Sequence, residues 1–314
     1  VYSDATKGWL PVSDDAVADV GVAPATQKAI FGYGYTGSNV SMTNLVSSSG
    51  VVASDVTGVG TARRYPEAAT YGGDKAIFGY GNTGSYVSMT NLVNNSGVVS
   101  TDVTGVGTAR GQLAASTYGL DKAIFGYGYS SGGLVSLTNL VSNSGVVASD
   151  TTGVGTTRAG LAAVGYGSTG QAIFGYGYSP SRVSITNLVS NSGVVSSDVT
   201  GVGTARDQLS AASYGGDKAI FGYGSTGSLT AITNLVSNSG VVASDTAGVG
   251  TARDIPSASG YGGDKAIFGY GGAGAGTFYS LTNLVSNTGV VASNTTGVGT
   301  ARQALGAAGF SYAA

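Results

Sequence analysis

An arginine and an aspartate recur along the chain at spacings that could place a ring of charges around one axis. Such a ring could bind one anion in a channel. Alternatively, each arginine could clamp backbone carbonyls or an aspartate of a neighbouring repeat, because a guanidinium donates several hydrogen bonds. We favour the clamp, since a single ligand rarely needs six identical contacts. The arginines are Arg63, Arg110, Arg158, Arg206, Arg253 and Arg302, and the aspartates are Asp55, Asp102, Asp150, Asp198 and Asp245, with Asn294 in the sixth place.

A second recurrent polar residue is the asparagine of the phrase TNLV, represented by Asn44, Asn91 and Asn139. Strand alternation places Asn44 on the same face as Val40 and Val46, which should be apolar. A buried amide must have its hydrogen bonds satisfied. We therefore expect these asparagines to bond the main chain of an adjacent strand. Lectin-like ligand binding, and a bulge that turns Asn44 outward, are the alternatives.

Catalytic and metal-binding residue patterns are missing from the sequence. The chain has no cysteine and no histidine, which excludes thiolate or imidazole metal ligands, cysteine nucleophiles and histidine bases. No pair of carboxylates is unique to one repeat, whereas glycosidases need two specifically placed acids. The acidic stretch at 13–19 lacks EF-hand spacing. We predict that the protein is not an enzyme and uses no metal or cofactor; a glycosidase or lyase is the least favoured alternative.

The charge balance limits the partners. A net charge of −2 gives no basic field for nucleic acid or anionic lipid. No apolar run approaches the roughly 20 residues of a membrane helix. We therefore expect neither nucleic-acid binding nor membrane insertion. The polar start VYSDATKGW, without Met, suggests that a segment precedes it.

These charged and polar residues belong to a long repeat. The phrase AIFGYG occurs six times, and its starts are separated by 47, 47, 49, 47 and 47 residues. Residues 28–74 and 75–121 differ at only 12 of 47 positions. A period of this length indicates a structural unit. The repeats start near Lys28, Lys75, Lys122, Gln171, Lys218 and Lys265.

Each repeat reads as four short strands joined by Gly-, Asn- and Ser-rich turns. In one copy the expected strands are 113–119, 122–128, 134–141 and 145–150, rich in β-branched and aromatic residues. One such sheet cannot bury its own faces, but six can if they stack in a ring. The sequence therefore predicts an all-β, six-bladed β-propeller of four-stranded antiparallel blades.

The chain ends favour closure of this ring. The first repeat starts at its second strand, and the tail 304–314 resembles the missing first strand. We expect the C-terminal strand to complete the first blade, which removes an open sheet edge. The propeller domain then spans 28–314, and residues 1–27 form an N-terminal tether. The stretch YSDATKGWLPV could itself form a strand pair.

The order of GVGTAR, then AIFGYG, then SLTNLVSNSG resembles the kelch repeat. In that family a small-residue strand after an arginine leads through a turn into an apolar strand that ends in glycines. Here Gly-Tyr-Gly replaces the double glycine of kelch, and the usual tryptophan of the fourth strand is absent. The AIFGYG phrase is also similar to repeats in bacteriophage structural proteins. This resemblance implies a part of a virion or phage tail.

The repeats differ mainly in two joins, the loop after AIFGYG and the connection after each clamp arginine. In an antiparallel blade these joins lie on one face of the disc, which we call the loop face. The SNSG and YGGD turns change little and lie on the opposite, constant face. Aromatic and arginine side chains on such loops favour recognition, and drift is the alternative. The candidate binding residues are Tyr35, Tyr65, Tyr86, Tyr129, Tyr178, Arg182, Phe278 and Tyr279, with Arg64 and Glu67 on the same loops.

These patterns predict a non-enzymatic display or adhesion module that binds a glycan or a protein through its loop face. We expect an extracellular or virion location and contacts with other assembly proteins through residues 1–27 or the constant face. The alternatives are a purely structural capping or decoration protein and a cellular lectin. A repeat protein designed for folding alone would show the same symmetry.

Overall fold

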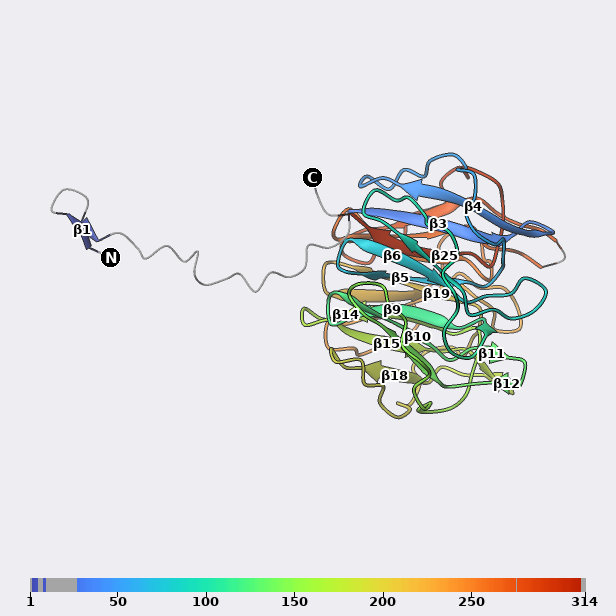
Figure 1. Ribbon diagram of the computed structural model, residues 1–314. Coiled ribbons are helices and arrows are strands. Elements are labelled where there is room, and N and C mark those ends of the chain that lie inside the picture. Colours follow the sequence, from blue (N-terminus) through green and yellow to red (C-terminus); the bar gives the residue numbers. More distant parts are fainter. Residues whose placement is uncertain (1, 5–7, 10–26, 275, 312–314) are drawn as a thin grey trace.

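The computed structural model describes residues 2–4, 8–9, 27–274 and 276–311, and these residues form strands and turns but no helix. The predicted all-β class is therefore confirmed. Each repeat contributes one three-stranded antiparallel sheet, in which the strand that carries AIF is central (Figure 1). The central strands are β3 (Lys28–Tyr35), β6 (Lys75–Gly79), β10 (Lys122–Gly126), β15 (Gln171–Gly175), β20 (Lys218–Gly222) and β23 (Lys265–Gly269).

The central strand is flanked by an inner strand on one side and by a TNLV strand on the other. The inner strands of sheets one to six are β25 (Gly306–Phe310), β5 (Glu67–Tyr71), β9 (Ala114–Tyr118), β14 (Ala162–Tyr166), β19 (Ser210–Tyr214) and β22 (Ser257–Tyr261). The TNLV strands are β4 (Asn39–Val46), β7 (Thr90–Val93), β13 (Thr138–Val141), β18 (Thr186–Val189), β21 (Thr233–Val236) and β24 (Thr282–Val285). Short strands on the loops are β8 (Arg110–Gly111), β11 (Tyr129–Ser130), β12 (Gly133–Leu134), β16 (Tyr178–Ser179) and β17 (Ser181–Arg182).

The C-terminal strand completes the first sheet, as its sequence predicts. Strand β25 pairs antiparallel with β3, so that Ala308 lies opposite Ile30. Figure 1 shows this pairing as a red strand beside a blue one. Each inner strand also contacts the inner strands of the preceding and following sheets, and β25 contacts both β22 and β5.

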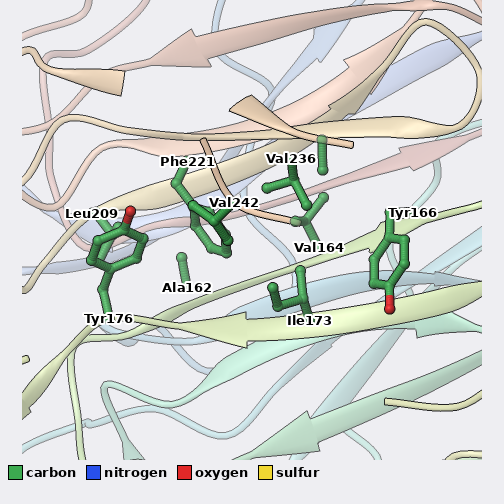
Figure 2. Close-up of a cluster of buried hydrophobic side chains, with 10 residues drawn as sticks. Ala162, Val164, Tyr166, Ile173, Tyr176, Leu209, Phe221, Val236 and Val242 are labelled. Atoms are coloured by element: carbon green, nitrogen blue, oxygen red, sulfur yellow. The ribbon is translucent and has the colours of Figure 1, made fainter. Parts of the chain in front are cut away.

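The core lies between consecutive sheets. Ile30 and Phe31 point to opposite faces of the first sheet: Ile30 packs against residues of the second sheet, and Phe31 against residues of the sixth. Figure 2 shows the equivalent cluster between the fourth and fifth sheets, where Tyr176 packs beside Phe221 with their ring centres 5.2 Å apart. Every phenylalanine and isoleucine of the AIF phrases is fully buried. The repeated phrase is therefore mainly the core of the protein.

The glycine and tyrosine that follow AIF have separate structural roles. A methyl group on Gly32 would lie 2.7 Å from the ring of Phe78, so only glycine leaves room for the phenylalanine of the next sheet. Tyr33 has a left-handed φ of 64°, and the register between β3 and β4 shifts at this point. This bulge turns the Tyr33 side chain into the contact between the first and second sheets.

The prediction of four regular strands per blade is only partly correct. The fourth segment of the first repeat meets β4 through isolated bridges, from Val46 to Val52 and from Thr43 to Val56. Between these bridges the Asn44 Nδ2 donates to the Ala53 carbonyl over 3.0 Å. The Asn44 side chain thus replaces part of the regular backbone hydrogen bonding between the strands, so the fourth segment does not form a continuous strand. The third strand is also shorter than expected, because in most repeats it consists of the TNLV residues alone.

The N-terminal segment contains the strand pair that its sequence allows, β1 (Tyr2–Asp4) with β2 (Gly8–Trp9). Most of the expected tether, residues 10–26, lies outside the described residues. The same holds for 312–314 at the end of the tail.

Candidate functional site

Each recurrent arginine is fully buried between two consecutive sheets. Arg63 Nε donates to the Tyr80 carbonyl over 2.8 Å, and its Nη2 donates to Asn91 Oδ1 over 2.7 Å, both in the second repeat. Its Nη1 donates to the Thr61 carbonyl. Its guanidinium also lies 4.1 Å from the ring centre of Tyr33 in the first repeat, where the π face attracts a cation. The arginine therefore joins the two sheets.

The recurrent aspartate extends this arrangement, which we call the arginine clamp. Asp102 accepts hydrogen bonds from Thr61 Oγ1 over 2.6 Å and from Asn91 Nδ2 over 2.9 Å. Although burial opposes it, these bonds lower the pKa of Asp102. Burial also raises the pKa of the stacked Tyr33 to about 12, so this phenol stays neutral. The clamp is a structural network that is fully hydrogen-bonded at this boundary.

The clamp recurs at four of the other five boundaries, where the expected asparagines and arginines are brought together in pairs. Arg110 donates to Asn139, and Arg302 donates to Asn44. The asparagines are fully buried and bond the main chain of the fourth segment, as a buried amide requires. The six arginines are buried between sheets, and none of them lines the cavities described below. The placement of these arginines between sheets is the one expected of a clamp that joins neighbouring repeats.

One boundary departs from this pattern. Between the fifth and sixth sheets Asn294 replaces the aspartate and accepts from Asn283 Nδ2 over 3.0 Å. Arg253 still donates to the Thr251 carbonyl, but its Nε and Nη2 have no hydrogen-bond partner within the described part of the chain. This clamp therefore holds a buried cation without a nearby carboxylate.

On the loop face, the predicted binding residues gather into separate groups. The first group joins the sixth and first repeats: the rings of Tyr35 and Phe278 meet edge to face, with centres 6.0 Å apart. The Arg64 guanidinium lies 5.1 Å from the Tyr35 ring centre and 5.8 Å from that of Tyr65. Two variable loops and one connection therefore build this group, which we call the aromatic–arginine cluster.

Two further groups lie on the neighbouring loops. The Tyr86 and Tyr129 ring centres are 6.1 Å apart, and Tyr129 is 42% exposed. Tyr178 is also 42% exposed and lies opposite Arg182 in the β16–β17 pair. Arg182 Nε donates to Asp207 Oδ1 over 2.7 Å, which holds the guanidinium beside the next connection. Tyr129 and Tyr178 are thus the most accessible of the predicted residues.

One residue assigned to the variable joins lies elsewhere. Tyr279 remains on its join, where it is half-buried and its backbone amide donates to the Gly271 carbonyl over 2.9 Å. Glu67 lies in the inner strand β5 and lines the cavity at the centre of the six sheets. Burial raises the pKa of Glu67 to about 8, only partly offset by the Ala68 backbone amide. The sequence around Glu67, an alanine-rich segment after a proline, does not predict this location. The location depends on where β5 lies among the six sheets, which local composition does not specify.

The described residues contain no group of three metal-ligating side chains. They also contain no helix that is long and apolar enough to cross a bilayer. No known family model matches the chain, and no curated protein matches it.

Proposed function

We propose that the six sheets form a closed, kelch-like six-bladed β-propeller that acts as a non-enzymatic display or adhesion module. In this proposal the loop face binds a glycan or a protein on another particle or cell, and the protein belongs to a phage tail, a virion or another extracellular assembly. The observation that carries the proposal is the gathering of aromatic and arginine side chains on one variable face of an otherwise uniform scaffold.

The proposed ring is supported by contacts that follow cyclic order. The Thr61 hydroxyl bonds Asp102 in the second sheet, and the Thr300 hydroxyl bonds Asp55 in the first. The last repeat therefore contacts the first as each repeat contacts the next. A ring of this kind leaves the loops on a rigid frame, which suits binding without a large ordering cost.

The chemistry of the loop face suits a glycan. Exposed aromatic rings offer a flat apolar surface, and tyrosine hydroxyls add hydrogen bonds. Tyr129 and Tyr178 supply both at neighbouring loops, while Arg64 and Arg182 are held in place by contacts with Tyr35 and Asp207. A held guanidinium can bind a carboxylate on an acidic sugar or a protein side chain.

The test is binding of the full chain to a glycan array and to intact microbial cells. We expect the double variant Tyr129→Ala, Tyr178→Ala to lose at least about tenfold in affinity. The matched control is Val146→Ser, Val194→Ser, which changes two exposed residues of the constant turns in the same repeats. Equal binding by all three proteins would contradict the proposal. Binding that survives enzymatic removal of cell-surface glycans would identify a protein receptor.

One observation favours the alternative, a structural capping or decoration protein. Six valines at the same place in each repeat are 62–66% exposed, and they follow the constant SNSG turns. Repeated exposed apolar side chains suit contact with an assembly partner. Absence of glycan and cell binding by the unmodified chain would favour this second function. The valines are Val51, Val98, Val146, Val194, Val241 and Val290.

A further inference from the structure

The inner strands of all six sheets enclose a cavity of about 120 Å³, which we call the axial cavity. Each inner strand pairs with its sheet along only one edge, so the other edge faces inward. The walls carry small residues and many hydroxyl groups, which include Thr70, Ser116, Thr117, Ser213 and Ser259. Such walls present oxygen atoms to a ligand in the cavity.

The end of the axial cavity on the loop face is narrow. There, the residue two positions after each clamp arginine has a left-handed φ, and backbone hydrogen bonds join five of the six successive pairs of these residues. Tyr65 donates to the Ala304 carbonyl over 2.8 Å, and Gln208 donates to the Gly160 carbonyl over 2.7 Å. This collar encloses a space of only about 30 Å³. The collar residues are Tyr65, Gln112, Gly160, Gln208, Ile255 and Ala304.

The opposite end is wider. A cavity of about 180 Å³ lies among the constant turns, lined by glycines, tyrosines and Lys265, whose ammonium pairs with Asp264. This arrangement leaves the constant face as the entrance to the axial cavity.

Glu67 is the single charged side chain that lines either the axial cavity or the collar space within the described chain. It is also the only glutamate in the sequence. The residues at the same register in the other inner strands are Ala114, Ala162, Ser210, Ser257 and Gly306.

Ser210 has the same register as Glu67 in the fifth sheet, but its hydroxyl does not open into the axial cavity. Its side chain is only 8% exposed and lies on the same strand face as Ala212 and Tyr214, which pack against the sixth sheet. The hydroxyl groups beside Glu67 are those of other wall residues, such as Thr70 in the same strand.

We propose that the axial cavity binds a small monovalent cation, held by the Glu67 carboxylate together with oxygen atoms of the cavity wall. The inference is independent of ligand binding by the loop face. One carboxylate balances one positive charge, whereas Ca²⁺ takes six to eight oxygens and several carboxylates. The chemistry fits an alkali-metal ion or the ammonium group of a small amine.

Cation binding at this site is coupled to proton release. Without a cation, burial keeps Glu67 protonated near neutral pH, since its pKa is about 8. A bound cation favours the ionised carboxylate and so lowers this pKa. The other titratable groups near the path are Tyr65 in the collar and, at the far entrance, the Lys265–Asp264 pair with Tyr166, Tyr214 and Tyr261.

The single glutamate makes the test direct. The full chain is labelled with ¹³C-glutamate, and its one side-chain carboxyl resonance is followed through a pH titration. The titration is run at equal ionic strength in potassium, sodium, methylammonium or tetramethylammonium chloride, the last being a cation whose four methyl groups keep its charge away from a carboxylate and leave it no hydrogen-bond donor. If the dissociation constant is about 10 mM, about 100 mM of the cation lowers the titration midpoint by about one pH unit.

We expect a lower midpoint of the Glu67 titration in at least one small cation than in tetramethylammonium. A response to methylammonium but not to the metal ions would identify an amine ligand. The same midpoint in all four salts would overturn the proposal, and it would leave the loop-face function untouched.

Discussion

Arg302 Nη2 donates a hydrogen bond of 2.6 Å to Asn44 Oδ1, although 258 residues separate them in the chain. The Nε of the same guanidinium donates to the Tyr33 carbonyl over 2.9 Å. The clamp that joins consecutive repeats therefore also joins the last repeat to the first. The two ends of the repeat array are held by side chains as well as by the pairing of β25 with β3.

Loss of this clamp should destabilise the whole protein. Arg302→Ala leaves the buried Asn44 oxygen and the Tyr33 carbonyl without their donor and opens a cavity beside Tyr270. We expect the free energy of unfolding to fall by about 3 kcal/mol or more, measured by urea denaturation. The control Arg182→Ala removes an arginine from a partly exposed ion pair and should cost about 1 kcal/mol or less. Equal losses would contradict the role of the clamp.

The clamp between the fifth and sixth sheets, in which an asparagine replaces the aspartate, should be improved by one substitution. Asn294→Asp would place a carboxylate where the other clamps have one and would balance Arg253, with an expected gain of about 1 kcal/mol. The hydrogen bonds that lower the pKa of Asp102 would act on this aspartate too. A lowered pKa means that the gain is fully present above the pKa of the unfolded chain and is lost as pH falls through the lower pKa of the folded protein.

Urea denaturation at neutral pH and near pH 3 checks this prediction. The reciprocal change Asp150→Asn should lower stability at neutral pH and have less effect in acid. A gain from Asn294→Asp that persists unchanged in acid would show that charge is not its cause.

Glu67 should make stability depend on pH in the opposite sense. Its pKa is raised from 4.5 to about 8, so the folded state holds the proton more tightly than the unfolded chain. The stability of the unmodified protein should therefore fall as pH rises from about 4.5 to about 8. Because the side chain is only half-buried, we expect an effect on the order of 1–2 kcal/mol.

The Glu67→Gln variant should lack this pH dependence. The measurement is the difference in free energy of unfolding between the two proteins across that pH range, in tetramethylammonium chloride so that no small cation competes. A difference that does not change with pH would be evidence against a raised pKa of the Glu67 carboxyl.

The first glycine of each AIFGYG phrase should tolerate no side chain. A methyl group on Gly79 would lie 2.6 Å from the ring of Phe125, which is itself fully buried. We expect Gly79→Ala to cost about 1–3 kcal/mol through forced movement of this ring. Gly132→Ala is the matched control, because the nearest atom to its new methyl group is 3.7 Å away. Thermal unfolding of both variants checks this prediction. If Gly79→Ala were as stable as the unmodified protein, the sheets could separate at little cost.

Much of the fold could be predicted because local chemistry is repeated. Glycine and asparagine turns, β-branched strands and the resemblance of 304–314 to an inner strand led to the strand order and to the pairing of β25 with β3. The fourth segment was harder to predict. Its composition suits a strand, but the Asn44 side chain takes up hydrogen bonds that a regular ladder would use.

The sequence by itself determined the repeat, the all-β class and the buried AIF core, because strand periodicity and turn residues act over a few neighbouring positions. Only the tertiary structure decided which repeats share a clamp, how Arg64 meets Tyr35, and that Glu67 faces the axial cavity. These relationships join residues that are tens to hundreds of positions apart. They depend on the packing of sheet against sheet and on the left-handed tyrosines of AIFGYG; the repeat marks these tyrosines in the sequence but not the contacts that they make.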